Sequence, residues 1–111
     1  MAEGDSGLRV SVVIPAWNAG DDLDRCLEAI LASDYPLHEC IVVDDASTEA
    51  STAEIARKHG ALLLRMEKQS GPGLARNHGA REASGEVLMF TDADVVLHPD
   101  AIGKAARALA A

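Results

Sequence analysis

The sequence predicts a single α/β domain in which a parallel sheet of about four strands is covered by helices. Apolar runs alternate four times with amphipathic runs of helical period, and the chain between consecutive apolar runs is long enough for a helical crossover. The chain has 111 residues, 48% of them hydrophobic and 25% charged, which suits one soluble globular domain with its own core. Such an alternation gives parallel strands joined by right-handed crossovers.

The first strand is predicted at Leu8–Ile14, and Pro15 is expected to end it because proline has no backbone N–H to donate. The first helix is predicted at residues 22–32, with Asp21 or Asp22 as its capping residue. Its apolar face repeats at helical spacing and consists of Leu23, Cys26, Leu27, Ile30 and Leu31.

The second strand, Cys40–Val43, is short and continuously apolar, as expected for a strand buried on both faces of a parallel sheet. Ser51 and Glu54 match a capping box that opens a helix reaching about His59. Gly60 is expected to end that helix in a left-handed conformation.

The third strand, Ala61–Arg65, is followed by Gly71-Pro72-Gly73, which leads into a helix. That helix carries small residues at Ala75, Gly79 and Ala83, so it can approach the sheet closely. Gly85 ends the helical stretch, a fourth strand is predicted at Glu86–Thr91, and a last helix starts at Pro99-Asp100. The order is therefore βαβαβαβα, a Rossmann-like arrangement.

Ligands of such sheets bind beyond the carboxyl ends of the strands, where the strand order reverses. The unusual polar and aromatic residues of this sequence fall at those ends: Trp17 and Asn18 after the first strand, Asp44 and Asp45 after the second, and Asp92 and Asp94 after the fourth. Their convergence predicts a binding site at that edge.

Asp92 and Asp94 lie one residue apart after the apolar run 87–90. In an extended segment such side chains point to the same side, and two carboxylates suit a hard cation such as Mg²⁺ or Mn²⁺. With ten basic and eighteen acidic residues, the net charge is −8, so an anionic ligand such as a diphosphate would need that cation as a bridge. The simpler alternative is a solvated turn in which an aspartate caps the next helix.

The other site candidates also have structural alternatives. Asp44 and Asp45 could serve a turn or a helix cap, and Trp17 could pack under its loop instead of stacking on a planar base. The helix start after Gly71 favours anions, and Arg76 could reach a phosphate or a carboxylate or lie on the surface. Neither a GxGxxG fingerprint nor a P-loop is present.

The composition excludes several classes of protein. Basic residues do not cluster, so binding to nucleic acid is not expected. Cys26 and Cys40 lack metal-site spacing and are expected to be buried thiols of a reducing compartment. Without a signal peptide or a membrane-length apolar run, the expectation is a cytoplasmic protein, peripheral at the inner membrane face if a longer parent chain carries an anchor.

From about Val10 to its end, the sequence resembles glycosyltransferase family 2, inverting enzymes of the GT-A fold that use nucleotide-diphospho-sugars. Four motifs in the same order carry the resemblance: Ser11-Val-Val-Ile-Pro-Ala-Trp-Asn18, Ile41-Val-Val-Asp-Asp-Ala-Ser-Thr48, Gly73-Leu-Ala-Arg-Asn77 and Gly85-Glu-Val-Leu-Met-Phe-Thr-Asp-Ala-Asp94. The resemblance implies a three-layer sandwich whose residues 8–111 form a nucleotide-diphospho-sugar-binding domain behind a flexible N-terminus, 1–7.

The resemblance also implies roles at the matching positions. Asp45, and less directly Asp44, would hydrogen-bond the base, typically uracil, so a UDP-sugar is the favoured donor. Trp17 would be the stacking ring, in a loop shaped by Pro15 and Asn18.

At the other end of the donor, Asp92 would lie near the ribose and Asp94 would hold Mn²⁺ or Mg²⁺ on the diphosphate. Arg76 belongs to the Ala-Arg-Asn stretch of the family, and its role is the least defined of the set.

The sequence departs from the family at Ala19-Gly20, where an acidic residue is common, and at Ala46, where glycine is common. The larger departure is length, since the family's acceptor half and catalytic base follow the second acidic pair. We therefore expect the donor-binding half of a glycosyltransferase. The alternatives are a non-catalytic nucleotide-sugar-binding module and a signalling receiver domain. A receiver domain needs a lysine at the end of a further strand, and the only lysine after Asp94 is Lys104, inside a predicted helix. An unpaired sheet edge would also allow self-association.

Overall fold

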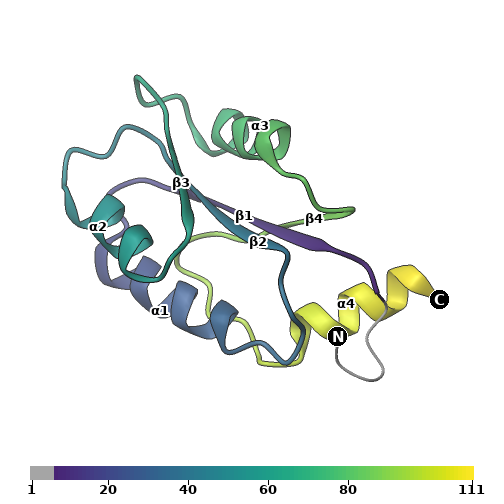
Figure 1. Ribbon diagram of the computed structural model, residues 1–111. Helices are drawn as coiled ribbons and strands as arrows, with labels where there is room; N and C mark the ends of the chain where they lie inside the picture. The colour runs from purple at the N-terminus through teal and green to yellow at the C-terminus, as the bar shows by residue number, and fades with distance from the viewer. Residues whose placement is uncertain (1–6) are drawn as a thin grey trace.

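The computed structural model describes residues 7–111, in which strands and helices alternate along the whole chain (Figure 1). The predicted βαβαβαβα order is confirmed. The elements are β1 (Val10–Ala16), α1 (Gly20–Leu31), β2 (Glu39–Asp44), α2 (Ser51–Lys58), β3 (Leu62–Arg65), α3 (Pro72–Glu82), β4 (Val87–Phe90) and α4 (Ala101–Ala110).

All strand pairs in the four-stranded sheet are parallel, and the order is β3-β2-β1-β4. β1 lies at the centre: Val13 pairs with Ile41 of β2 on one side and with Phe90 of β4 on the other. Figure 1 shows α3 on one face of the sheet and α1, α2 and α4 on the other, which confirms the three-layer arrangement. Because β2 and β4 flank β1 on opposite sides, the strand order reverses at β1, and the carboxyl end of β1 is the expected ligand position.

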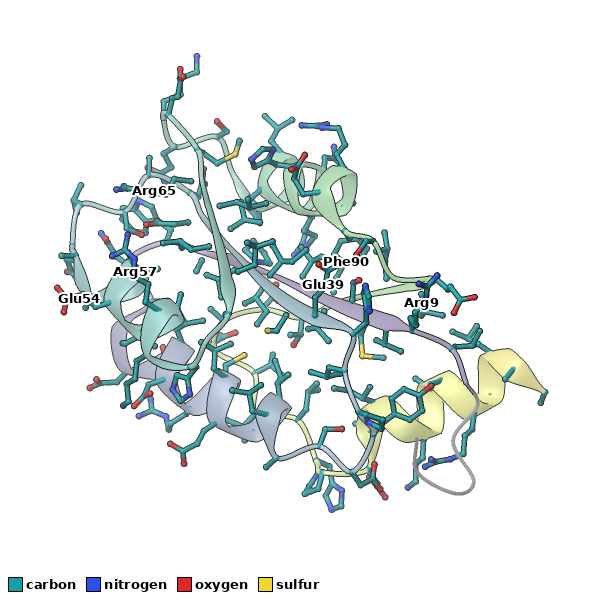
Figure 2. All side chains as sticks on the ribbon, viewed as in Figure 1. Arg9, Glu39, Glu54, Arg57, Arg65 and Phe90 are labelled. Atoms are coloured by element: carbon teal, nitrogen blue, oxygen red, sulfur yellow. The ribbon has the colours of Figure 1, made fainter. Side chains whose placement is uncertain are left out.

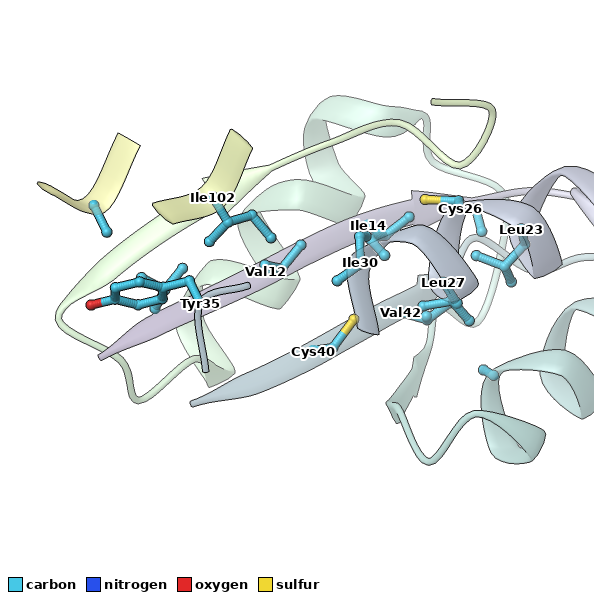
Figure 3. Packing of buried hydrophobic residues seen from close by; sticks show 14 residues of the cluster. Val12, Ile14, Leu23, Cys26, Leu27, Ile30, Tyr35, Cys40, Val42 and Ile102 are labelled. Atoms are coloured by element: carbon cyan, nitrogen blue, oxygen red, sulfur yellow. The ribbon is translucent and has the colours of Figure 1, made fainter. Parts of the chain in front are cut away.

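The core has two parts because side chains of a strand alternate between the two faces of the sheet. Val12 and Ile14 of β1 pack with Leu27 and Ile30 of α1 and with Ile102 of α4 (Figure 3). On the opposite face, a smaller cluster consists of Val13, Ile41, Val43 and Ala75. The central strands are therefore buried on both faces, as their continuous apolar runs predict.

The small-residue face of α3 allows that helix to lie directly on the sheet. Ala75 and Gly79 are buried, and a Cβ added to Gly79 would collide with Val13 Cγ1 and lie 3.0 Å from Val43 Cγ2. No side chain larger than a hydrogen fits at this position without moving the helix or the sheet. The predicted close approach is confirmed.

The prediction that Pro15 ends the first strand is wrong, since β1 continues through Pro15 to Ala16. The N–H of Thr91 donates to the Val13 carbonyl, so the alternate residues of β1, which include Pro15, face β4. β4 pairs with β1 only as far as Val13. The missing N–H of Pro15 therefore falls where no strand needs it.

Both predicted helix caps are also wrong. α1 begins after Ala19 and α2 after Ala50, and neither residue makes a side-chain cap hydrogen bond. Instead the Ala19 N–H donates to the hydroxyl of Thr52 in α2, at 3.2 Å. A long-range contact thus replaces the local cap. Gly60 has a φ of +73° after α2, which confirms its predicted left-handed stop.

Cys26 and Cys40 are free and buried on the α1 face of the sheet (Figure 3), as the sequence predicts for core thiols. Burial raises the pKa of Cys26 to about 11 and that of Cys40 to about 12, so both stay protonated at neutral pH. Within residues 7–111, none of the helices has the length and apolar character needed to cross a bilayer.

Candidate functional site

The residues singled out by sequence lie at the carboxyl ends of three neighbouring strands. Trp17 follows β1, Asp45 follows β2, and Asp92 comes two residues after β4. A cavity of about 280 Å³ opens at this edge, and its lining consists of Pro15, Ala16, Trp17, Asp45, Gln69, Gly71 and Pro72. Trp17 is 48% exposed, so its indole is available to a ligand and is not packed under its loop.

A second cavity, of about 270 Å³, lies at the opposite end of the sheet, between residues 7–9 and 35–38. Its only ionisable side chains besides Tyr35 are Arg9 and His38. Figure 2 shows Arg9 at this end, far from Arg65 at the carboxyl end of β3. We place the functional site at the carboxyl end, because aromatic and acidic side chains converge only there among these two cavities.

Asp45 joins β2 to the segment that precedes α3. Its carboxylate is buried, with 4% of the residue exposed, and accepts the N–H of Ser70 at 2.8 Å on Oδ1 and the N–H of Gly71 at 2.9 Å on Oδ2. Gly71 is the residue immediately before α3, so the carboxylate lies at the positive end of that helix. The helix start where the sequence indicated an anion site thus already has an anionic neighbour in Asp45.

Asp44 serves the turn after β2, which is the structural alternative considered from the sequence. Its Oδ1 accepts the N–H of Ser47 at 2.9 Å, and its Oδ2 lies 3.3 Å from Nε of Arg65. The aspartate is only 1% exposed. The Asp44 carboxylate therefore joins the turn between β2 and α2 to Arg65, the last residue of β3. The turn itself contains Ala46 at φ +59°, a left-handed conformation that glycine adopts without strain.

Asn18 ties the loop after β1 to the loop after β2. Its Nδ2 donates to the Thr48 hydroxyl at 3.0 Å, and its Oδ1 accepts the N–H groups of Thr48 and Glu49 at 3.0 and 3.1 Å. Its own N–H donates to the Ser47 hydroxyl at 2.9 Å. Asn18 has a φ of +44°, a conformation that asparagine tolerates better than most residues. These bonds fix the loop that carries Trp17.

Asp92 and Asp94 are exposed, and they lie in a turn, not at the end of an extended strand. β4 ends at Phe90, and the N–H of Val95 donates to the Asp92 carbonyl at 3.1 Å. Alternate side chains share one side only in an extended strand, so the sequence spacing of Asp92 and Asp94 does not make them point the same way. Among residues 7–111, no group of three or more His, Cys, Asp or Glu side chains is placed to hold a metal ion.

Arg76 of α3 pairs with Asp92, with 3.0 Å between Nη2 and Oδ1. Both side chains are partly exposed, and ion pairs of this kind contribute roughly 0–1 kcal/mol. A ligand can therefore exchange one partner at little cost. α3 also links the two parts of the site, because Gly71 and Pro72 line the cavity and Arg76 comes about one helical turn later.

Cys26 of α1 contacts the acidic turn, a contact that could not be predicted because the residue belongs to the apolar face of its helix. Its thiol donates to the Asp92 carbonyl across 3.6 Å. The raised pKa of Cys26 comes mainly from burial, with further contributions from the charges of Asp94 and Asp92. The thiol therefore keeps its proton and holds the turn against the core. Gln69 and Ser70 were missed as well, and only their position before the glycine pair marks them.

The chain is similar in sequence and in fold to known glycosyltransferases. Residues 11–111 match the sequence profile described as glycosyl transferase family 2. The chain is 35% identical over 95 residues to the uncharacterized glycosyltransferase YibD of Escherichia coli, and 36% identical over 96 residues to the glycosyltransferase AglE of Haloferax volcanii. These matches cover 82% and 80% of this chain but only 27% and 31% of the relatives, so it spans about a third or less of their length.

The solved structures that share this fold include two that are at least 30% identical to the chain in sequence. One is the mannosyltransferase PcManGT of Pyrobaculum calidifontis in complex with GDP-Man and Mn²⁺, with a TM-score of 0.84 and 32% identity over 96% of this chain and 34% of that one. The other is TarS 1-349 of S. aureus in complex with UDP, with a TM-score of 0.79 and 30% identity over 89% of this chain and 31% of that one.

Proposed function

This chain belongs to glycosyl transferase family 2, and on that premise we propose that it binds a nucleotide-diphospho-sugar as the donor of a sugar-transfer reaction. One observation carries the proposal: an exposed tryptophan and a buried aspartate line one cavity, and a single helix links that cavity to an exposed acidic turn. In this proposal the base of the donor lies in the cavity beside Trp17, and the diphosphate lies at the acidic turn of Asp92 and Asp94.

At the base end, Trp17 supplies a flat ring for stacking, and Pro15 lines the same cavity. Asp45 faces the same cavity and, in this proposal, accepts a hydrogen bond from the base. Each of its oxygens already accepts one backbone N–H, and a carboxylate oxygen has a second acceptor site. We propose UDP-sugars as the first donors to test, because one structural relative was crystallised with UDP. GDP-sugars are the second, because another relative was crystallised with GDP-Man.

At the diphosphate end, we propose that Asp94, with Asp92 beside it, holds Mn²⁺ or Mg²⁺. Their exposed carboxylates are hard oxygen ligands, which suits either ion. Two carboxylates leave most of a six-coordinate shell for water and phosphate oxygens, so this donor set fits a cation that binds together with its nucleotide. Such an ion would offset the charge of a departing diphosphate. Arg76 pairs with Asp92 in the absence of ligand and lies within reach of the same phosphates.

Transfer of the sugar requires a base that deprotonates the acceptor hydroxyl. We assign no residue among the 111 to that role, because the exposed carboxylates at the site are already assigned to the donor. The proposal is therefore the donor-binding half of an inverting family 2 enzyme, with its acceptor unknown. A non-catalytic nucleotide-sugar-binding module is the second candidate, because the cavity and the acidic turn could bind a donor without transferring its sugar.

Calorimetry with UDP and GDP, each with and without MnCl₂, tests donor binding, and a hydrolysis assay with UDP-glucose tests turnover. We expect Mn²⁺-dependent binding of at least one nucleotide, and a loss of affinity of about tenfold or more in Asp94→Asn. Asp21→Asn, the same change at an exposed residue of α1, is the matched control. Binding without hydrolysis would favour the module, and absence of binding under all conditions would contradict both.

Self-association stays a prediction. β4 is an edge strand of the described sheet, and its side chains Leu88 and Phe90 are 40% and 45% exposed. Exposed strand edges with apolar side chains tend to pair with other chains. We expect the apparent mass in light scattering to rise with protein concentration, and Leu88→Lys to suppress that rise. A constant monomer mass would contradict this prediction.

A further inference from the structure

We propose that Asp45 is a positioning residue of the nucleotide cavity, whose carboxylate holds the Ser70–Gly71 segment in place as one wall of that cavity. This inference rests on the proposed function and deepens it. Replacing a residue that only contacts the base would leave the backbone of Ser70 and Gly71 as it is, whereas replacing a residue that places the wall would release that backbone and so weaken every nucleotide.

The contacts of Asp45 fix both ends of the link. Its backbone N–H donates to the Ala16 carbonyl at 2.8 Å, which fixes the residue to the carboxyl end of β1. Its side chain then reaches across 25 and 26 sequence positions to the N–H groups of Ser70 and Gly71. Hydrogen bonds to a buried carboxylate are among the stronger ones in proteins, because charge assists them and water does not compete.

Without this carboxylate the wall would lose its partners. Gly71 precedes the first turn of α3, where backbone N–H groups have no partner within the helix. The next residue, Pro72, has no N–H and also lines the cavity. A displaced segment would carry Gly71 and Pro72 away from Trp17, which lies in the lining of the same cavity.

The backbone of Gly71 offers an independent way to move the same wall. Its φ of +95° and ψ of 160° lie in a region that is essentially accessible to glycine alone. A Cβ added there meets no atom within 4 Å, so an alanine at this position would act only through backbone strain. Gly73, two residues later within α3, is also surrounded by open space but has no left-handed backbone, so it provides a matched control.

The experiment compares four proteins: wild type, Asp45→Asn, Gly71→Ala and Gly73→Ala. Trp17 is the only tryptophan of the chain, so its fluorescence reports binding of UDP and of GDP in the presence of MnCl₂. Amide hydrogen exchange of Ser70 and Gly71 reports whether the wall is held. Thermal melts identify any variant that does not fold.

We expect Asp45→Asn to lose affinity for UDP and GDP by the same factor, about tenfold, because an asparagine nitrogen cannot accept the second N–H. Exchange at Ser70 and Gly71 should accelerate in the same variant. Gly71→Ala should weaken both nucleotides similarly, although Asp45 is intact, and Gly73→Ala should bind as wild type does. If Asp45→Asn does not fold, the pair of glycine variants decides.

Two results would overturn the proposal. One is unchanged amide exchange at Ser70 and Gly71 in Asp45→Asn, whatever its affinities for the two nucleotides, which would mean that Asp45 does not hold the wall. The other is wild-type affinity in Gly71→Ala. If the wild type binds neither nucleotide, the proposed function fails, and slow amide exchange that is lost in Asp45→Asn would show separately that the link to the wall exists.

Discussion

The two ends of the site differ in how completely they are built before any ligand arrives. At the base end, the Asn18 side chain makes three hydrogen bonds, that of Asp45 makes two, and that of Asp44 makes one hydrogen bond and an ion pair with Arg65; both aspartates are buried. At the other end, Asp92 and Asp94 are exposed in a turn, and one surface ion pair engages Asp92. The base end is therefore preorganised, whereas the exposed side chains of the acidic turn have few partners and, in the proposed function, would take their final geometry from the cation and phosphate that they bind.

The largest effect on stability should come from truncating Asp44 at the base end, in contrast to Asp94 at the exposed end. Asp44→Ala leaves the Ser47 N–H and the Arg65 guanidinium without their carboxylate partner, so we expect a loss of about 2–3 kcal/mol in the free energy of unfolding. Asp94→Ala, the matched variant at the exposed end, should change it by less than about 0.5 kcal/mol. Urea unfolding followed by circular dichroism measures both. Equal losses would remove the contrast between the two ends.

A second prediction concerns the thiols, of which Cys26 anchors the acidic turn to the core. Burial is the largest cause that raises the pKa of Cys26 to about 11 and that of Cys40 to about 12, from 9.0 in an unfolded chain. The folded state binds these protons more tightly, so its advantage is complete below about pH 9 and is lost as the pH rises toward 11 and 12. The urea concentration at the midpoint of unfolding should therefore decrease as the pH is raised from about 8 to about 10.5.

The double variant Cys26→Ala, Cys40→Ala tests the origin of that pH dependence. It should be less stable at every pH, because each change removes a buried sulfur from the core, but its midpoint should fall less between the same two pH values. An equal fall in the variant and the wild type would assign the alkaline sensitivity to other groups.

A smaller effect is expected at the ion pair of the open end. Arg76→Ala should lower the free energy of unfolding by less than about 1 kcal/mol, because the Arg76–Asp92 pair is solvent-exposed and screened. That loss should shrink further in 0.5 M salt, in the manner typical of surface pairs. A salt-independent loss of about 2 kcal/mol or more would show that the open end is as tightly built as the base end.

The smallest effect should be a gain at the base end. Ala46 has a φ of +59°, and releasing that strain in Ala46→Gly should offset the greater entropy of glycine in the unfolded chain. We expect an increase of roughly 0.5 kcal/mol in the free energy of unfolding. Ala83→Gly, at the end of α3 where φ is −70°, is the control and should give no gain. A loss at Ala46 would mean that its backbone relaxes to a different turn.

The sheet could be predicted from the sequence because its signals are local. The apolar run at 40–43 and the positive φ of Gly60 follow from residue type and spacing alone. The errors at Pro15, Ala19 and Ala50 share a different cause. Whether a proline is tolerated in a strand depends on how far the neighbouring strand extends, and the N–H of Ala19, the residue before α1, donates to Thr52 of another helix.

The site could be predicted only as a set of residues at strand ends. That Asp45 binds the Ser70–Gly71 segment, that Arg76 pairs with Asp92, and that the Cys26 thiol reaches the acidic turn all depend on contacts between distant segments. A spacing pattern carries no information about such contacts. Residue chemistry gave the candidates, and packing decided which groups each of them contacts.

The pairing of β1 with β4 has a consequence for the order in which this protein folds. Val10 pairs with Val87, so the central strand can accept its second neighbour only after nearly the whole chain has been brought together. Contacts across so long a loop form slowly, because the entropy of closing the loop is lost before the strands can pair. The acidic turn therefore follows the strand whose pairing joins the most distant parts of the described sheet, and this pairing should make folding slow compared with domains that have only local contacts.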